Sequence, residues 1–189
     1  MFARLVTFAI VVVLAGPALA APESYTVDPR HSFPSFEINH YGFSTYRGRF
    51  NKMTGHINLD REAKKVAADI VIDANTIDTG LDELEARLRK PDYFDTAKYP
   101  TITFKAANGR FEGDVLKTLD GELTIRGQTK PVTLNLTHFA CGPRPVTKRP
   151  QCGADAVATI KRSDFGMTRS LPEVGDEVKL LIQVEAFKD

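Results

Sequence analysis

The sequence predicts an all-β protein, an eight-stranded antiparallel up-and-down barrel with one short helix. The first observation is the strict alternation of apolar and polar residues, which is typical of strands with one buried face. Seven segments alternate in this way, within residues 35–40, 45–50, 66–73, 101–105, 132–137, 154–160 and 178–187. The second observation is that turn-forming residues separate many of these segments, which is typical of sequential hairpins. A sheet of about eight such strands loses its exposed edges by closing into a barrel.

Four glycine-containing stretches are predicted to form turns between the strands. Asn, Asp and Gly tolerate the left-handed backbone conformations that tight hairpins require. The stretches are Asn108–Gly109, Asp120–Gly121, Arg126–Gly127 and Val174–Gly175–Asp176.

One segment follows helical spacing. Leucines lie three and four positions apart within residues 81–90, which contain no Gly or Pro. Asp78 or Thr79 can cap the start of this segment, and Pro91 closes it. We expect a short helix over residues 81–90 that lies across one mouth or one side of the barrel.

The first twenty residues have the three-part layout of a secretory signal peptide. Arg4 precedes an almost entirely apolar run over residues 5–14, and Ala18-Leu19-Ala20 offers a small-x-small cleavage site. An uncleaved anchor is the alternative, but the run is shorter than the roughly 20 residues that span a bilayer. We therefore expect removal of residues 1–20 and a single barrel domain over residues 21–189, located in the periplasm or secreted.

The two cysteines are consistent with that location. Cys141 and Cys152 flank a proline-rich loop, and in an oxidising compartment such a pair is expected to form a disulfide. A metal site is the alternative, but two thiols at this spacing without a His pair match no zinc pattern. A bridge across a loop of this size stabilises the fold by roughly 3 kcal/mol in the chain-entropy description.

Charge and motifs argue against several functions. The 25 Lys and Arg residues nearly balance the 24 Asp and Glu residues, whereas general nucleic-acid binding needs a basic excess. The four histidines show no metal-ligand spacing. The residue types of a catalytic triad crowd into residues 28–32, whereas triads join distant segments. We expect Asp28-Pro29 to begin a turn, with His31 and Ser32 satisfying nearby backbone groups. The sequence thus indicates no catalytic residue, metal or resident cofactor.

The apolar sheet face is the candidate site, and it has two interpretations. Phe36, Phe50 and Phe104 lie on the inward-facing sides of three expected strands. An eight-stranded barrel is just wide enough either to be filled by side chains or to hold one slender ligand. The residues alone favour a packed core, because most apolar faces simply pack.

Motifs along nearly the whole expected mature chain resemble those of the YceI-like family of exported, lipocalin-like proteins. They include residues 25–32, 47–50, 92–95, 99–104 and 162–167, and their order and spacing make the match specific. The resemblance implies an elongated eight-stranded barrel with an internal apolar tunnel. It also implies that the tunnel binds a polyisoprenoid, an isoprenoid quinone or a similar amphiphilic chain, with no settled catalytic activity. This reverses the preference for a filled core.

The chain departs from the family pattern in two places. Arg87 stands where the family commonly has a histidine, within a run that reads Leu-Glu-Ala-Arg-Leu-Arg over residues 84–89. The loop between Cys141 and Cys152 is also not a general feature of the family.

The resemblance and the strand alternation together assign residues to the tunnel. Seven apolar residues are expected on its walls: Phe36, Ile38, Phe50, Ile72, Phe104, Leu123 and Ile125. Gly48 is expected to leave room where the ligand passes close to a strand. Phe43, Phe94 and Phe165 are placed at the mouth or under the helix.

Few polar residues are candidates for contact with a ligand head group. His40 lies two positions after Ile38 on the same expected strand, so its side chain should also point inward. It could donate to a quinone carbonyl or a pyrophosphate oxygen. A histidine hydrogen-bonded to backbone is the alternative. Arg87 or Arg89 could meet an anionic head, with simple exposure to solvent as the alternative.

Two other functions remain open from the sequence. One is a ligand-free stress or interaction protein with a filled barrel. The other is an enzyme that acts on a small lipophilic substrate, with His40 as its general acid or base. Transient membrane contact and a homodimer are both compatible with the sequence, which demands neither.

Overall fold

Long strands make up most of the chain in the computed structural model, which describes residues 22–189. Within these residues there are eleven strands: β1 (Glu23–Val27), β2 (Phe33–His40), β3 (Ser44–Phe50), β4 (Met53–Asp60), β5 (Lys65–Asp73), β6 (Ile77–Asp78), β7 (Thr101–Glu112), β8 (Val115–Ile125), β9 (Gln128–Pro143), β10 (Pro150–Lys161) and β11 (Val174–Lys188). The helical elements are α1 (Asp82–Leu88) and two 3₁₀ turns, η1 (Ala74–Thr76) and η2 (Arg162–Phe165). The predicted signal peptide, residues 1–20, lies outside the described residues.

Eight of the strands described in residues 22–189 close into an antiparallel barrel. Their hydrogen-bonded order is β1–β4–β5–β7–β8–β9–β10–β11, and β11 returns to β1. The predicted barrel is confirmed. Strands β2, β3 and β6 extend the sheet from β11 beyond this ring, because β11 pairs with β2 in its first half and with β1 at its end.

The bend between β1 and β2 explains how β11 pairs with both strands. The backbone N–H of Asp28 and the hydroxyl of Ser32 both donate to the carbonyl of Glu185, at 2.8 and 3.1 Å. His31 Nδ1 lies 2.8 Å from a carboxylate oxygen of Asp28. Ser32 therefore satisfies backbone, as predicted, whereas the ring of His31 pairs with the carboxylate of Asp28 and not with a backbone group as predicted.

The predicted inward faces are clearest in β5. Val66, Ala68, Ile70 and Ile72 are buried, whereas the residues between them are exposed or half-buried. Alternation identifies this face because successive side chains of a strand point to opposite sides of the sheet.

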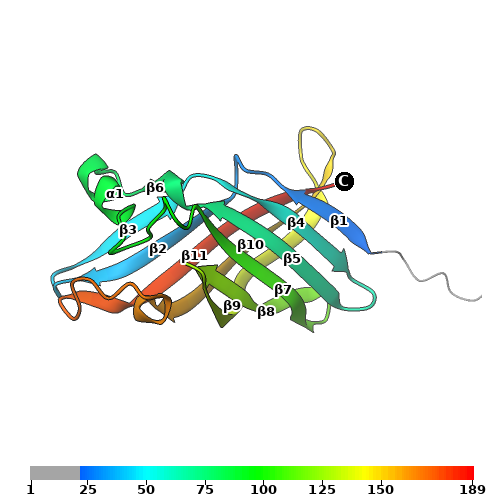
Figure 1. Cartoon of the computed structure of the whole chain (residues 1–189). Helices are drawn as coiled ribbons and strands as arrows, with labels where there is room; N and C mark the ends of the chain where they lie inside the picture. Colours follow the sequence, from blue (N-terminus) through cyan, green and yellow to red (C-terminus); the bar gives the residue numbers. More distant parts are fainter. Residues whose placement is uncertain (1–21) are drawn as a thin grey trace, which may run out of the picture.

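The two ends of the barrel differ (Figure 1). We call one end the mouth; it carries the β2–β3 hairpin, α1 and the segment over residues 162–173. The other end, the base, carries the start of β1, the end of β11 and the β9–β10 hairpin.

Side chains close the base, and a disulfide joins two of its strands. A buried cluster fills it, made of Tyr25, Leu59, Val66, Leu116 and Ala186. Cys141 and Cys152 pack against this cluster and form the predicted disulfide between directly opposed positions of β9 and β10. The barrel is therefore sealed at this end.

Three of the four predicted turns are wrong. Asn108–Gly109 lies inside β7, Asp120–Gly121 lies inside β8, and Val174–Gly175–Asp176 begins β11. The fourth, Arg126–Gly127, joins β8 to β9 with both residues at positive φ, as the prediction required.

Close packing explains why two of these glycines lie within strands. A Cβ atom on Gly109 would lie 2.4 Å from Cγ1 of Val66, and one on Gly121 would lie 2.6 Å from Cζ of Phe104. Glycine is needed where a neighbouring side chain folds over the strand. Local turn propensity carries no information about such a neighbour.

Helix α1 is present, but it is shorter than predicted and is capped differently. It begins at Asp82 after Leu81, with no side-chain cap. The reason is that Asp78 accepts a hydrogen bond from the backbone N–H of Gly80, which turns the chain at a φ of +74° before the helix begins. Acidic residues in the first turn of α1 interact favourably with the helix dipole.

Candidate ligand cavity

A cavity of about 310 Å³ lies inside the barrel. Apolar side chains from most strands of the barrel line it, with Ile57 and Leu119 next to the cluster that closes the base. It extends to the mouth, where Tyr41 is both a lining residue and half exposed. Its volume is within the range of small-molecule sites, which are typically apolar with a few polar groups.

Nine of the twelve residues predicted for the tunnel line this cavity. They are Phe36, Ile38, His40, Phe50, Ile72, Phe94, Phe104, Leu123 and Ile125. Six of them come from strands where alternation set the inward face, and Leu123 and Ile125 come from β8, where the family resemblance pointed to them. Phe94 comes from the segment that follows α1, and its ring meets Phe50 edge-on at a centroid distance of 5.4 Å.

The other three residues do not line the cavity. Phe43 lies at the mouth, in the β2–β3 hairpin, but its side chain is 93% exposed. Phe165 is 1% exposed and packs in the closed core beside the cavity. A Cβ atom on Gly48 would lie 2.5 Å from Cζ of Phe36, so this glycine makes room for that ring and not directly for a ligand.

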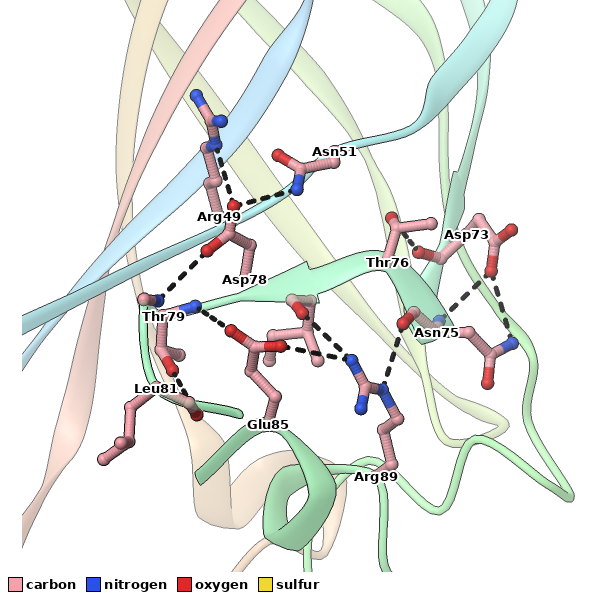
Figure 2. A network of polar contacts seen from close by, with 12 residues as sticks. Arg49, Asn51, Asp73, Asn75, Thr76, Asp78, Thr79, Leu81, Glu85 and Arg89 are labelled. Atoms are coloured by element: carbon pink, nitrogen blue, oxygen red, sulfur yellow. Dashed lines mark hydrogen bonds and ion pairs between the residues drawn. The ribbon is translucent and has the colours of Figure 1, made fainter. Parts of the chain in front are cut away.

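Helix α1 covers one side of the cavity with Leu84, Arg87 and Leu88. A polar network attaches the helix to β6 (Figure 2). In this network Glu85 accepts from the backbone N–H of Thr79 at 3.0 Å and pairs with Arg89 at 3.4 Å.

Arg89 belongs to this network and does not line the cavity. Its guanidinium donates to the backbone carbonyls of Asn75 and Ile77, at 3.1 and 3.4 Å (Figure 2). Of the two alternatives for this side chain, contact with a head group and exposure to solvent, the structure shows neither, because backbone carbonyls hold the guanidinium. Arg87, two positions earlier on the helix, does line the cavity.

Asp78 anchors the other side of the network. Its carboxylate accepts from the side chain of Asn51 and from the backbone of Gly80, and pairs with Arg49 at 3.7 Å (Figure 2). The hydrogen bond from Asn51, with that from Gly80 and the charge of Arg49, holds the pKa of Asp78 below its ordinary value. Asp78 therefore stays charged at neutral pH.

Most of the polar lining gathers near the mouth. Besides Ser35 on β2, its members are His40, Tyr41, Tyr46, Thr79, Arg87, Tyr93, Arg162, Arg169 and Ser170. The charged residues among them are all arginines, and no carboxylate of residues 22–189 lines the cavity. The local charge therefore favours a ligand whose polar end carries acceptor oxygens.

His40 points into the cavity, as its parity predicts. Its ring contacts that of Tyr41 edge-on at 4.5 Å, and the ring of Tyr46 lies at 5.6 Å. Within the described part of the chain, no hydrogen bond to its imidazole orients it as a catalytic base. Residues 22–189 also hold no cluster of three or more His, Cys, Asp or Glu side chains that could bind a metal ion.

Sequence reasoning missed the role of Arg162. This buried guanidinium donates to four backbone carbonyls at 2.7 to 2.9 Å, those of Met167, Arg169, Val174 and Gly175. It thereby ties the loop at the mouth to the end of β10. Burial lowers the pKa of Arg162, although a guanidinium remains protonated in proteins.

Asp176 supports the same loop. Its carboxylate accepts from the backbone N–H and the hydroxyl of Ser163, at 2.9 and 2.8 Å. Burial opposes its ionisation, but these hydrogen bonds and the nearby charge of Arg162 outweigh burial and lower the pKa of Asp176. The sequence motif over residues 162–167 contained Arg162, but its carbonyl partners lie up to thirteen positions away.

Comparison with known proteins is consistent with this architecture. The family model described as a YceI-like domain matches residues 25–186. The chain belongs to the YceI-like family. Protein YceI of Escherichia coli O6:H1 is 36% identical over 185 residues, which cover 96% of this chain and 95% of that protein. UPF0312 protein PA0423 of Pseudomonas aeruginosa is 34% identical over 177 residues, or 92% of this chain and 91% of that protein.

Solved structures share the fold. The chain resembles BcnA of Burkholderia cenocepacia with a TM-score of 0.72 at 25% identity, over 84% of this chain and 98% of BcnA. It also resembles a polyisoprenoid binding domain from Saccharophagus degradans with a TM-score of 0.66 at 20% identity, over 88% of this chain and 99% of that domain. In this YceI-like chain, no helix within residues 22–189 has the length and apolar character needed to cross a membrane.

Proposed function

We propose that this YceI-like protein binds a long-chain amphiphilic lipid, a polyisoprenoid, an isoprenoid quinone or a similar chain, inside its barrel. The observation that carries the proposal is the apolar cavity, which ends at the cluster around Tyr25 and reaches the mouth. A filled barrel would have no such space. The likeness to the Saccharophagus degradans domain concerns the fold, so the case for a lipid rests on the cavity of this chain.

The energetics favour a chain-like ligand. Each CH₂ group moved from water into an apolar site contributes about 0.8 kcal/mol. About ten buried carbons therefore contribute roughly 8 kcal/mol, which is comparable with the cost of about 4–15 kcal/mol for immobilising a ligand. The apolar walls need no specific hydrogen bond to achieve this, so the length and width of the chain set the selectivity.

The polar lining supports a ligand with one polar end directed to the mouth. Arg87 and Arg169 have no ion-pair partner within the described residues, and each has donors to offer a carbonyl, carboxylate or phosphate oxygen. Arg162 is largely committed to backbone carbonyls. We therefore assign head-group contact to Arg87, Arg169 and His40.

The protein is proposed to act outside the cytoplasm, in the periplasm or after secretion, where it would carry, store or sense its lipid. The disulfide supports an oxidising compartment, and the predicted signal peptide over residues 1–20 supports export. N-terminal sequencing of the protein purified from a periplasmic fraction is expected to begin at Ala21. A protein retained in the cytoplasm with residues 1–20 intact would contradict this location.

Native mass spectrometry, followed by extraction into organic solvent, tests the lipid proposal. The purified protein is expected to carry an added mass that dissociates and is recovered as a long-chain lipid. Replacement of Ile72 by Trp should reduce the lipid-bound fraction, because Ile72 faces the cavity from β5.

A matched control comes from the next residue on the same strand. Val71 points to the outer face and is exposed, so Val71→Trp adds the same side chain without entering the cavity. It should retain wild-type lipid content. Equal lipid content in a folded Ile72→Trp variant and in Val71→Trp would contradict a ligand in this cavity. Failure of the wild-type protein to take up an added long-chain lipid would contradict it as well.

A further inference from the structure

The mouth carries an exposed apolar hairpin tip next to the cavity. Phe43 is 93% exposed and Tyr41 is 51% exposed, and both belong to the short turn between β2 and β3. We call residues 41–43 the apolar tip. Leu81, just before α1, is a further half-exposed apolar residue at the same end of the barrel.

The backbone holds the apolar tip in one conformation. Tyr41 and Gly42 have φ values of 55° and 73°, and the N–H of Phe43 donates to the carbonyl of His40 at 3.1 Å. The N–H of Tyr41 donates to the carbonyl of Glu173 at 2.9 Å, which fastens the hairpin to the loop before β11. Tyrosine rarely adopts a positive φ, so the surrounding bonds must impose it. Phe43 is thereby directed away from the rest of the barrel.

Tyr41 connects the apolar tip to the cavity. Its side chain lines the cavity and remains half exposed, and its ring contacts the inward-facing His40 at 4.5 Å. Aromatic side chains therefore continue from the interior of the barrel through Tyr41 to Phe43, beside the polar residues that line the mouth.

Charges of both signs surround the mouth. The guanidinium groups of Arg87 and Arg169 line the mouth and have no ion-pair partner among the described residues. Acidic residues lie at the same end, among them Asp82, Glu83 and Glu85 on α1, Asp164 in η2 and Glu173 beside the apolar tip. Because charges of both signs lie there, burial of the aromatic rings would dominate the affinity, and salt would weaken it only modestly.

We propose that the mouth docks on a phospholipid bilayer, with Phe43 and Tyr41 inserted at the boundary between head groups and acyl chains. Aromatic side chains are well suited to this interface. Docking there would let a lipid pass between the leaflet and the cavity without crossing water. The role in lipid exchange rests on the proposed lipid-binding function, whereas docking itself can be measured independently.

A single tryptophan can report docking directly, because the chain has no tryptophan. Phe43→Trp places the reporter in the apolar tip, and Val146→Trp places it in the β9–β10 hairpin at the base, where Val146 is 88% exposed. Each variant is mixed with vesicles of phosphatidylethanolamine and phosphatidylglycerol that carry brominated acyl chains. The fluorescence of Phe43→Trp should shift to the blue and be quenched, and that of Val146→Trp should change little.

Docking through the mouth would be overturned if the vesicles did not quench the fluorescence of Phe43→Trp. It would also be overturned if they quenched both reporters equally. A second copy of the chain could cover the apolar tip instead. In that case sedimentation would show a dimer that Phe43→Ser dissociates, with no quenching by vesicles, and the proposal would be wrong.

Lipid exchange is tested with a fatty acid that carries a fluorescent anthroyloxy group. Transfer from the wild-type protein to acceptor vesicles should accelerate as vesicle concentration rises. Phe43→Ser should slow it by about tenfold, because the variant loses burial of one aromatic ring. Val146→Ser should match the wild type, and Phe43→Ser should retain its equilibrium affinity for the probe because Phe43 does not line the cavity.

The two proposals can fail separately. The proposed function would be contradicted if the wild-type protein neither bound the probe nor yielded a lipid on extraction. Quenching of Phe43→Trp by vesicles would still show whether the mouth docks on a bilayer. A wild-type protein that binds the probe, but whose transfer rate depends on neither vesicle concentration nor Phe43, would overturn the exchange role.

Discussion

Replacement of Arg162 by methionine is expected to destabilise the protein by about 4 kcal/mol. Methionine keeps much of the apolar stem but removes four hydrogen bonds to the backbone carbonyls of the mouth loop. Hydrogen bonds from a charged donor contribute about 1.5–3 kcal/mol each, so four at the lower value sum to about 6 kcal/mol. We expect a smaller loss because residues near the mouth can rehydrate their carbonyls.

Two further variants separate charge from geometry. Arg162→Lys keeps the positive charge, but an ammonium group cannot span four carbonyls as the planar guanidinium does, so most of the loss should remain. Arg169→Met removes an arginine that has no ion-pair partner among residues 22–189, and its effect should stay within about 0.5 kcal/mol.

Urea denaturation followed by circular dichroism measures these losses as a lower midpoint at an unchanged slope. Hydrogen exchange should show weaker protection over residues 166–175 in Arg162→Met. The reasoning would be refuted by a loss below about 1 kcal/mol in that variant, or by wild-type stability in Arg162→Lys.

Three other predictions concern the base and the barrel wall. Burial, together with a hydrogen bond to a neighbouring carboxylate, raises the pKa of Tyr25 to about 12 from its ordinary value of 10.0. Its phenol should be the last to ionise in an absorbance titration, and its contribution to stability, complete below pH 10, should be lost as the pH rises through about 12. Replacing both Cys141 and Cys152 by Ser should cost roughly 3 kcal/mol in urea denaturation while lipid content stays unchanged, because the disulfide lies at the base. Gly48→Ala should cost about 1–3 kcal/mol, because its Cβ would lie 2.5 Å from the ring of Phe36.

Each of these has a control. Tyr25→Phe should remove the last step of the phenol titration, and persistence of that step would assign it to another tyrosine. Reduction and alkylation of the wild type should reproduce the double-serine variant, so a difference between them would argue against the disulfide as the source of the loss. A Cβ atom on Gly142 would meet no atom within 4 Å, so Gly142→Ala should leave the stability unchanged. The packing argument would be refuted if Gly48→Ala and Gly142→Ala changed the stability equally.

Local pattern predicted the parts of the site that lie on regular strands. Ile72 and Phe104 line the cavity because the side chains of a strand alternate between its two faces. The same parity placed His40 inward. Phe43 and Phe165 lie outside regular strands, and no local rule decides whether such a ring is buried.

Glycine illustrates the same limit. Gly121 follows an aspartate, as in a hairpin turn, but it lies within β8 because the ring of Phe104 from the adjacent strand covers it. For Arg89 the sequence leaves contact with a head group and exposure to solvent both open. The side chain turns instead toward β6, where carbonyls brought by the fold satisfy its guanidinium.

The sequence by itself determined the all-β barrel, its inward faces, the pairing of Cys141 with Cys152 and membership of the YceI-like family. Each of these depends on period, spacing or composition, which are properties of the chain. Only the tertiary structure decided that the barrel has a cavity, that the base is closed and that Arg162 organises the mouth. These depend on which distant atoms meet, because a cavity and a buried donor are defined by neighbours that no local pattern specifies.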